Sequence, residues 1–275
     1  MMECSVIIPT LSEKRSGQLV RTLEALVVQE TDRDFEVIVI DGSSCARITN
    51  SLRPFSKTEK LHLTYRENPN DQGPGHARNV GIELARGEIL LFIDDDARPG
   101  LHLIEEHIKS HEDRYNLAVL GQVFESDERF YTIRETPTHG QYYDWRCFWT
   151  TNLSLRRKWV EEDKFDVSFG YGCEDLDLGY RLWKKGLSVL YNMRAKVFHD
   201  HPFTYEGWCE RAYVLGGGAG MLCKKYPELV RYYEGHRLRR WMKNLVRDRL
   251  FNLSLRLQRS YNFDRGFKEE FEACQ

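Results

Sequence analysis

The chain has 275 residues and a formal net charge of −2, with 41% hydrophobic and 30% charged residues. This length fits one large domain, or one domain with a helical extension. The composition is typical of a globular protein that buries a core and argues against a disordered chain. The balanced charge argues against nucleic-acid binding, which needs a basic surface. Acidic residues nevertheless cluster at Asp94–Asp96 and Glu174–Asp177, and arginines gather in the last quarter of the chain.

The N-terminal residues lack a basic region followed by an apolar stretch, so we predict no signal peptide. No segment approaches the ~20 apolar residues that a membrane-spanning helix needs. The seven cysteines are widely spaced and form no Cys-x-x-Cys pair, which favours free thiols in a reducing compartment. These features together predict a cytoplasmic protein.

Short apolar runs alternate with helical spacing of leucines in the first part of the chain. Strands are expected at 4–8, 35–40, 61–65 and 89–93, and helices at 17–29, 47–55 and 76–85. This alternation is typical of an α/β fold, a mostly parallel central sheet with helices on both faces. Ligands of such sheets bind at the carboxyl ends of the strands. Polar residues follow three strands and are expected to converge there: Thr10 to Glu13, Asp41 to Ser44, and Asp94 to Asp96.

The second half of the chain is less regular. We expect strands at 117–123, 187–191 and 196–198, a helix at 174–185, and helices from about residue 205 onward. The aromatic and polar residues 126–150 suit a loop-rich wall. Gly216–Gly220 follows no strand, so close helix packing or a flexible turn is expected there rather than a phosphate loop.

The three adjacent aspartates Asp94–Asp96 follow the apolar strand 89–93. Neighbouring carboxylates repel one another unless a cation lies between them, and a divalent cation that bridges to phosphate is a natural partner. A solvated acidic turn is the plain alternative. A Walker B strand would need an upstream Gly-x-x-x-x-Gly-Lys-Ser/Thr segment, which the chain lacks. The phosphoacceptor of a receiver domain is a further alternative, but such domains are about half this length.

Two other motifs contain candidate catalytic or metal-binding residues. Glu174–Asp177 begins a predicted helix, where carboxylates cap the helix dipole or, beside a metal site, serve as a general base. His199 follows a short predicted strand, and an imidazole is a suitable third ligand beside carboxylates, for manganese in particular. A structural histidine is the alternative, and His201, two residues later, is a second candidate ligand.

Together these segments resemble the family 2 glycosyltransferases, which have the GT-A fold with a Rossmann-like sheet. The resemblance covers roughly residues 4–225. The segments that carry it follow the order of the family's motifs. In the first half of the chain, Cys4–Thr10 resembles the first strand and nucleotide loop, Phe35–Ser43 the second strand with its base-binding aspartate, and Gly75–Gly81 the Ala-Arg-Asn segment. Asp94–Asp96 resembles the Asp-x-Asp motif, Thr151–Arg157 the segment Gly-Asn-Leu-Ser-x-Arg-Arg, and Glu174–Leu182 the Glu-Asp motif.

The resemblance implies a role for each matching residue. The residues expected to bind the nucleotide sugar are Pro9, Thr10, Glu13, Asp41 (at the base), Arg78, Asp94 (at the ribose) and Asp95. Those expected to bind the metal, Mn2+ or Mg2+, are Asp96 and His199. Trp149, Asn152 and Glu174 are expected at the donor sugar or acceptor, and Asp175 is the expected catalytic base. Tyr142, Tyr143 and Trp145 are further candidates for stacking on a sugar, with core packing as the alternative.

The activity implied is that of an inverting, metal-dependent glycosyltransferase. Its donor would be a nucleoside diphosphate sugar, a UDP-sugar by family frequency, and its acceptor a hydroxyl of a glycan or lipid-linked glycan. The implied domains are a catalytic domain at 1–205, with a nucleotide-sugar half at about 1–100 and an acceptor half at about 101–205, and a helical extension at 206–275. A nucleotidyltransferase would usually show a basic glycine-rich loop in place of Pro9–Glu13. Intact Asp96 and Asp175 argue against a non-catalytic sugar-nucleotide-binding protein.

The arginine-rich segment 236–259 contains eight basic residues and one acid. Its apolar residues have the spacing of an amphipathic helix. Such a helix can lie on an anionic membrane, which would make the enzyme peripheral at the inner face of the membrane. The alternatives are that it contacts another subunit in a homo-oligomer, or that it packs on the catalytic domain with its arginines in solvent.

Overall fold

The computed structural model describes residues 2–55, 61–124, 138–200, 204–233 and 262–270. The chain divides into two compact units, one formed by Met1–Val167 and Asp175–Pro202 and the other by Ser168–Glu174 and Phe203–Gln275. Across the described ranges, no helix combines the length and the apolar character that crossing a membrane requires. The arginine-rich segment 236–259, for which an amphipathic helix was expected, lies outside these ranges.

The first unit is built on a sheet whose N-terminal half is parallel. Its strands lie in the order β3-β2-β1-β4. Their bounds are β1 Cys4–Thr10, β2 Phe35–Asp41, β3 His62–Glu67 and β4 Ile89–Ile93. The central strands β1 and β4 are buried along their whole length, as their continuous apolar runs predict. The expected parallel arrangement is therefore confirmed for this half.

The other half of the sheet mixes the two strand directions. Its strands are β5 Ala97–Pro99, β6 Leu117–Phe124, β7 Tyr142–Tyr143, β8 Asn152–Arg156 and β9 Ser188–His199. Strand β8 lies antiparallel between β4 and β6, β6 pairs parallel with β9, and β5 and β7 pair antiparallel with β9. The α/β fold is thus a mixed sheet around a parallel half.

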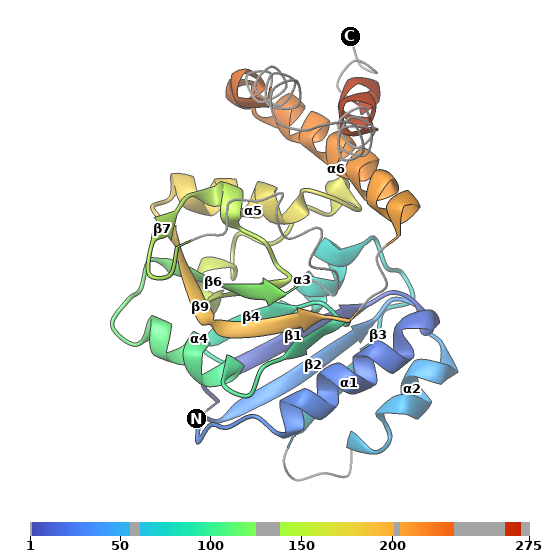
Figure 1. Cartoon of the computed structure of the whole chain (residues 1–275), viewed down its shortest axis with the longest axis vertical. Coiled ribbons are helices and arrows are strands. Elements are labelled where there is room, and N and C mark those ends of the chain that lie inside the picture. The colour runs from blue at the N-terminus through green and yellow to red at the C-terminus, as the bar shows by residue number, and fades with distance from the viewer. Residues whose placement is uncertain (1, 56–60, 125–137, 201–203, 234–261, 271–275) are drawn as a thin grey trace, which may run out of the picture. The chain divides into compact units, whose positions relative to one another are not determined.

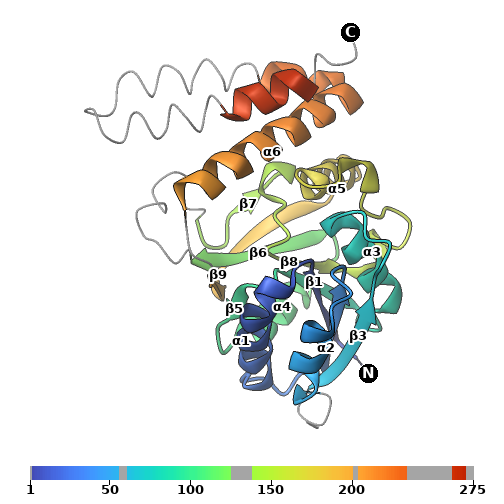
Figure 2. The ribbon, with the colours of Figure 1, turned by 90° about the vertical axis from the view of Figure 1, so that its right-hand side faces the viewer.

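Helices cover both faces of this sheet (Figures 1 and 2). Helices α1 Ser16–Val27, α2 Ala46–Leu52 and α4 Leu103–His111 pack in one core, and α3 Pro74–Leu84 and α5 Glu174–Lys184 pack in the other. Side chains alternate along each strand, so Val6 and Ile8 enter the first core and Ile7 the second. Burial on both faces explains the continuous apolar runs Val6–Pro9 in β1 and Ile89–Ile93 in β4.

The structure contains elements that the sequence did not predict, namely helix α4 and strands β5, β7 and β8. The two short strands expected at 187–191 and 196–198 are one continuous strand, β9. Strand β9 bulges opposite Gly121, where Asn192 and Lys196 pair with consecutive residues of β6. The bulge interrupts the alternation of side chains, and this is why the sequence pattern breaks there.

In the described part of the second unit, helices dominate. Helix α6 spans Tyr205–Lys225, a 3-10 turn follows at Pro227–Leu229, and residues 262–270 form a further helix. A β-carbon on Gly216 would lie 2.0 Å from the carbonyl oxygen of Phe263, and one on Gly266 would lie 2.1 Å from that of Tyr213. The glycines therefore allow two helices to touch through their backbones, and of the two alternatives for this segment the structure favours close helix packing.

Candidate active site

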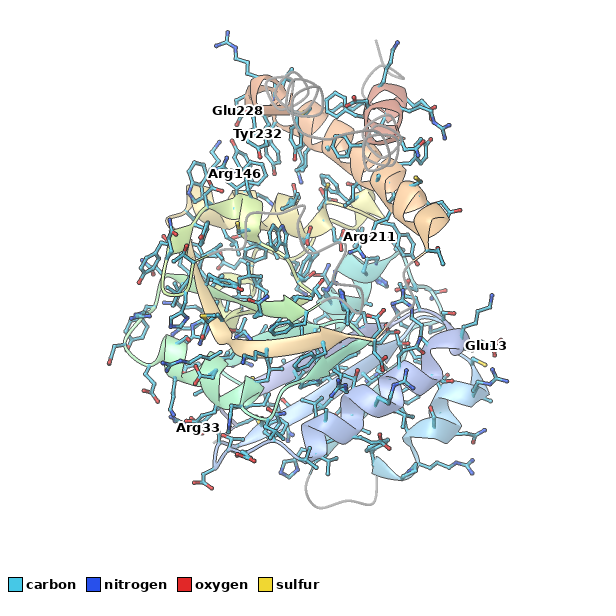
Figure 3. The ribbon with its side chains drawn as sticks, viewed as in Figure 1. Glu13, Arg33, Arg146, Arg211, Glu228 and Tyr232 are labelled. Atoms are coloured by element: carbon cyan, nitrogen blue, oxygen red, sulfur yellow. The ribbon has the colours of Figure 1, made fainter. Side chains whose placement is uncertain are left out.

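Polar side chains gather at the carboxyl ends of the parallel strands. Thr10, the last residue of β1, pairs in register with Asp41, the last residue of β2. The adjacent Pro9 is buried within β1, and Asp94 directly follows β4. Figure 3 shows Glu13, which follows β1, at the end of the strands opposite to Arg33, which precedes β2. This end of the sheet is where ligands of open α/β sheets bind.

Asp94, Asp96 and His199 form a cluster at this end. Each offers one ligand atom, and these atoms lie within 4.8 Å of one another. Strand β5 brings the histidine in, because Ala97 pairs with His199. The backbone N–H of Asp200 also donates to the carbonyl oxygen of Asp96 at 2.7 Å. Two carboxylates and an imidazole form a donor set that fits a divalent cation such as Mn2+ or Mg2+.

Positive groups stabilise the ionised carboxylate of Asp94. Burial opposes its ionisation, but the hydrogen bond from His199 and the charge of Arg78 outweigh burial and hold the pKa of Asp94 well below its usual range. The Arg78 guanidinium lies 3.3 Å from Asp94 Oδ1 and 5.7 Å from the centre of the Phe165 ring. Asp94 is therefore available as a charged ligand over the whole physiological pH range.

Asp95 faces a different set of partners. The Thr10 hydroxyl donates to its Oδ2 at 2.8 Å, and Arg15 donates to its Oδ1 at 2.9 Å. Burial raises the pKa of Asp95 to about 6, with Arg15 opposing and Asp96 adding to that rise. The same Arg15 nitrogen lies 3.3 Å from Asp96 Oδ2. Arg15 was not expected at this site from the sequence, where its position five residues after the end of β1 is its only signal.

Asp41 is held in a fixed orientation at the end of β2. Its Oδ1 accepts hydrogen bonds from the Ser43 N–H at 2.8 Å and the Ser43 hydroxyl at 2.6 Å, and its Oδ2 accepts one from the Tyr65 hydroxyl at 2.9 Å. Burial and the nearby carboxylate raise the pKa of Tyr65 to about 12, so its hydroxyl remains a donor. Exposed Glu13 accepts from the Cys45 thiol at 3.1 Å.

Asn152 does not join these groups. Its side chain is fully buried, and its amide nitrogen donates to the carbonyl oxygens of Gln122 and Ala195 at 3.2 and 2.9 Å. Its amide oxygen lies 2.9 Å from His107 Nε2 on α4. Asn152 therefore ties together three strands and a helix, and its amide group is fully engaged by other parts of the protein. Trp149 is half-buried and packs against the core formed with α3 and α5.

The carboxylates of the Glu-Asp motif lie in the first turn of α5. Asp175 belongs to the first unit and is half-buried, and its Oδ1 accepts from the N–H of Leu176 at 2.8 Å. Glu174 belongs to the second unit and accepts from the N–H of Gly172 at 3.2 Å. The preceding loop is unusual, because Gly170, Gly172 and Cys173 all have positive φ angles. His201, the second candidate ligand, lies outside the described residues.

Two bacterial proteins are similar to this chain in sequence. YfnE, an uncharacterized glycosyltransferase of Bacillus subtilis (strain 168), is 28% identical over 83% of this chain and 71% of its own length. Validoxylamine A glucosyltransferase of Streptomyces hygroscopicus subsp. jinggangensis (strain 5008) is 27% identical over 74% of this chain, which spans only 56% of that protein.

Two solved structures have the same fold at low sequence identity. A mannosyltransferase from Pyrobaculum calidifontis, in complex with GDP-Man and Mn2+, matches 99% of this chain and 88% of its own with a TM-score of 0.70 at 15% identity. TarS 1–349 of Staphylococcus aureus, in complex with UDP, matches 99% and 91% with a TM-score of 0.60 at 17% identity. The model of the family "Glycosyl transferase family 2" matches residues 5–177, more than half of the chain. The protein therefore belongs to glycosyl transferase family 2 and is a glycosyltransferase with the GT-A fold.

Proposed function

We propose that the enzyme transfers a sugar, with inversion and with the help of a divalent cation, from a nucleoside diphosphate sugar to a hydroxyl group. The cluster of Asp94, Asp96 and His199 at the carboxyl ends of the strands is the observation that carries this proposal. It lies where the fold binds ligands, and its donor set suits the cation that a diphosphate requires.

The position and hydrogen bonds of Asp41 support the proposal that the enzyme binds a nucleotide. Its carboxylate is buried and bonded at both oxygens, so its orientation is fixed before a nucleotide arrives. A preorganised carboxylate is suited to recognise N–H groups of a base. A UDP-sugar is our proposed donor, because UDP is bound in the TarS structure. GDP-Man in the archaeal mannosyltransferase makes a GDP-sugar the alternative.

The metal would be held by Asp96 and His199, with Asp94 at the same cluster and toward the ribose. A bound Mn2+ or Mg2+ would supply Lewis-acid stabilisation of the diphosphate leaving group. Arg78 adds a fixed positive charge beside Asp94, and its buried position keeps it there. Its charge also favours an anionic ligand at this end of the sheet.

Asp175 is our proposed base. It would take the proton of the acceptor hydroxyl while the oxygen attacks the anomeric carbon from the face opposite to the leaving group. One direct displacement through an oxocarbenium-like transition state inverts the anomeric configuration. The bond from the Leu176 N–H to Asp175 Oδ1 supports this role, because it orients the carboxylate at the helix N-terminus. We propose a glycan or lipid-linked glycan as acceptor.

The experiment begins with a thermal-shift screen of UDP-, GDP- and dTDP-sugars with Mn2+ or Mg2+, followed by transfer assays with the donor that binds. We expect Asp175→Asn to bind the donor as the wild type does and to lose transfer, whereas Asp113→Asn, an exposed aspartate of the same charge, keeps both. Transfer by Asp175→Asn at the wild-type rate would contradict the assignment of the base. NMR of the product tests inversion directly.

A further inference from the structure

We propose that Arg15 is a built-in counter-ion of the aspartate triplet, which holds the place of the metal in the metal-free enzyme and leaves it when a divalent cation binds. This inference rests on the metal site of the proposed function. Arg15 lies outside the segments that resemble the family's motifs, and its contacts with the aspartates support the inference.

One nitrogen of Arg15 bridges two carboxylates. Its Nη1 lies 2.9 Å from Asp95 Oδ1 and 3.3 Å from Asp96 Oδ2. Asp96 is also a member of the metal cluster, so the guanidinium and a metal would compete for the same carboxylate. Two positive charges on one carboxylate repel each other, so each weakens the binding of the other, and the more exposed of the two can leave.

Asp95 is the anchor that holds Arg15 in this position. Its second oxygen accepts the Thr10 hydroxyl, and its backbone carbonyl accepts the Thr22 hydroxyl at 3.0 Å. Both carboxylate oxygens are therefore engaged by protein groups, and Asp95 is not part of the cluster formed by Asp94, Asp96 and His199. Its fixed position keeps the guanidinium over Asp96 until something stronger replaces it.

The contrast in exposure shows which partner can move. The side chain of Arg15 is 49% exposed, whereas those of Asp95 and Asp96 are 3% and 5% exposed. Arg15 ends a 3-10 turn, Glu13–Arg15, at the start of α1, so its guanidinium can swing into water without any change in the core. Arg78, the other arginine bonded to the triplet in the described structure, is buried and stays in place. Buried carboxylates thus keep a cation nearby with or without a metal, which limits their desolvation cost.

Calorimetric titration with Mn2+ alone, without nucleotide, tests this inference. Arg15→Gln should bind Mn2+ about three- to tenfold more tightly than the wild type, because a half-exposed competing charge is removed. Arg15→Lys should lie between the two. The matched control is Lys14→Gln, which removes the same charge from the neighbouring exposed residue, for which no carboxylate contact is found within the described ranges. Its Mn2+ affinity should stay within about twofold of the wild type.

Thermal melting gives a second, independent measurement. The metal-free Arg15→Gln protein should melt at a lower temperature than the wild type, because Asp95 and Asp96 lose their counter-ion, and Mn2+ should raise its melting temperature by more. Unchanged or weaker Mn2+ binding by Arg15→Gln would overturn the inference. A wild-type enzyme that binds no Mn2+ would instead contradict the metal site of the proposed function, so the two failures are distinguishable.

Discussion

The carbonyl oxygen of Gly172 lies 2.4 Å from where a β-carbon on Gly218 would stand. Helix α6 thus touches the backbone of the loop that precedes α5. Cys173, in the same loop, has a φ of 66°, which is unfavourable for any residue other than glycine, and its thiol lies 3.6 Å from the carbonyl oxygen of Leu215. The contact with α6 stabilises this strained loop, which ends at Glu174.

We therefore expect Gly218→Ala to lower the free energy of unfolding by about 1–3 kcal/mol, because the new methyl group meets a backbone carbonyl that cannot move without shifting the loop. Gly217→Ala is the matched control in the same helix. A β-carbon there would meet nothing closer than 3.8 Å, so the helix should be unaffected or stabilised by up to about 1 kcal/mol. Urea denaturation of both variants decides, and equal stabilities would contradict the proposed role of this contact.

Two buried histidines predict that the enzyme loses stability in mild acid. Burial lowers the pKa of His107 to about 4 and that of His111 to about 3, and the charges of His107 and Arg156 lower the pKa of His111 further. Both histidines bond to the Ser154 hydroxyl, and within the described residues Nδ1 of His111 has no hydrogen-bond partner. Protonation of either imidazole would therefore place a positive charge in the buried core.

The pKa values of His107 and His111 in the folded protein lie below the ordinary histidine value of 6.5, so the unfolded chain binds more protons between about pH 4 and 6.5. The stabilisation is complete above about pH 6.5 and is lost progressively as the pH falls toward about 4. With about 1.4 kcal/mol per pKa unit, the loss is on the order of several kcal/mol. Urea denaturation at neutral pH and at about pH 5 measures how the free energy of unfolding changes with pH. This change should be smaller for His111→Phe than for the wild type, and the same as the wild type's for the exposed His102→Gln. An identical slope in His111→Phe would contradict this explanation.

The parallel half of the sheet could be predicted because each of its strands shows its own pattern in a short stretch of sequence. Strands buried on both faces are continuous apolar runs, and each ends where polar residues begin, as at Thr10 and Asp94. The position of Asp94 and Asp96 followed from the same logic, since the carboxyl ends of parallel strands share one edge. His199 was expected from the family resemblance, and it reaches the cluster on β9, which pairs with β5.

Strand β8 and helix α4 could not be predicted, because they are held together by polar contacts between distant residues. Asn152 and Ser154 place polar side chains inside a buried strand, where His107 and His111 on α4 bond to them. Gly121 completes the arrangement, since a β-carbon there would lie 2.1 Å from the Asn152 amide nitrogen.

Tyr65 should contribute to nucleotide binding through Asp41. Tyr65→Phe removes the hydrogen bond to Asp41 Oδ2 and leaves the two bonds from Ser43 intact. The carboxylate then loses part of its fixed orientation, and we expect nucleotide affinity to fall about fivefold, equivalent to about 1 kcal/mol. Tyr115→Phe, which also removes only a hydroxyl but at an exposed residue beside Arg156, serves as control. Calorimetry with UDP measures both, and unchanged affinity in Tyr65→Phe would argue against Asp41 as the base-recognising residue.

His199 should determine which cation the site prefers. Mg2+ selects oxygen ligands and retains its waters, whereas an imidazole nitrogen beside carboxylates suits Mn2+ better. His199 Nε2 lies 3.9 Å from Asp94 Oδ2, so its loss leaves the carboxylates in place and removes the nitrogen. We expect His199→Ala to bind Mn2+ about tenfold more weakly and Mg2+ only slightly more weakly, which reduces the preference for Mn2+. The exposed His102→Ala should match the wild type with both ions. If His199→Ala lost affinity for Mn2+ and Mg2+ equally, the histidine would act on the site through Asp94 and not as a ligand.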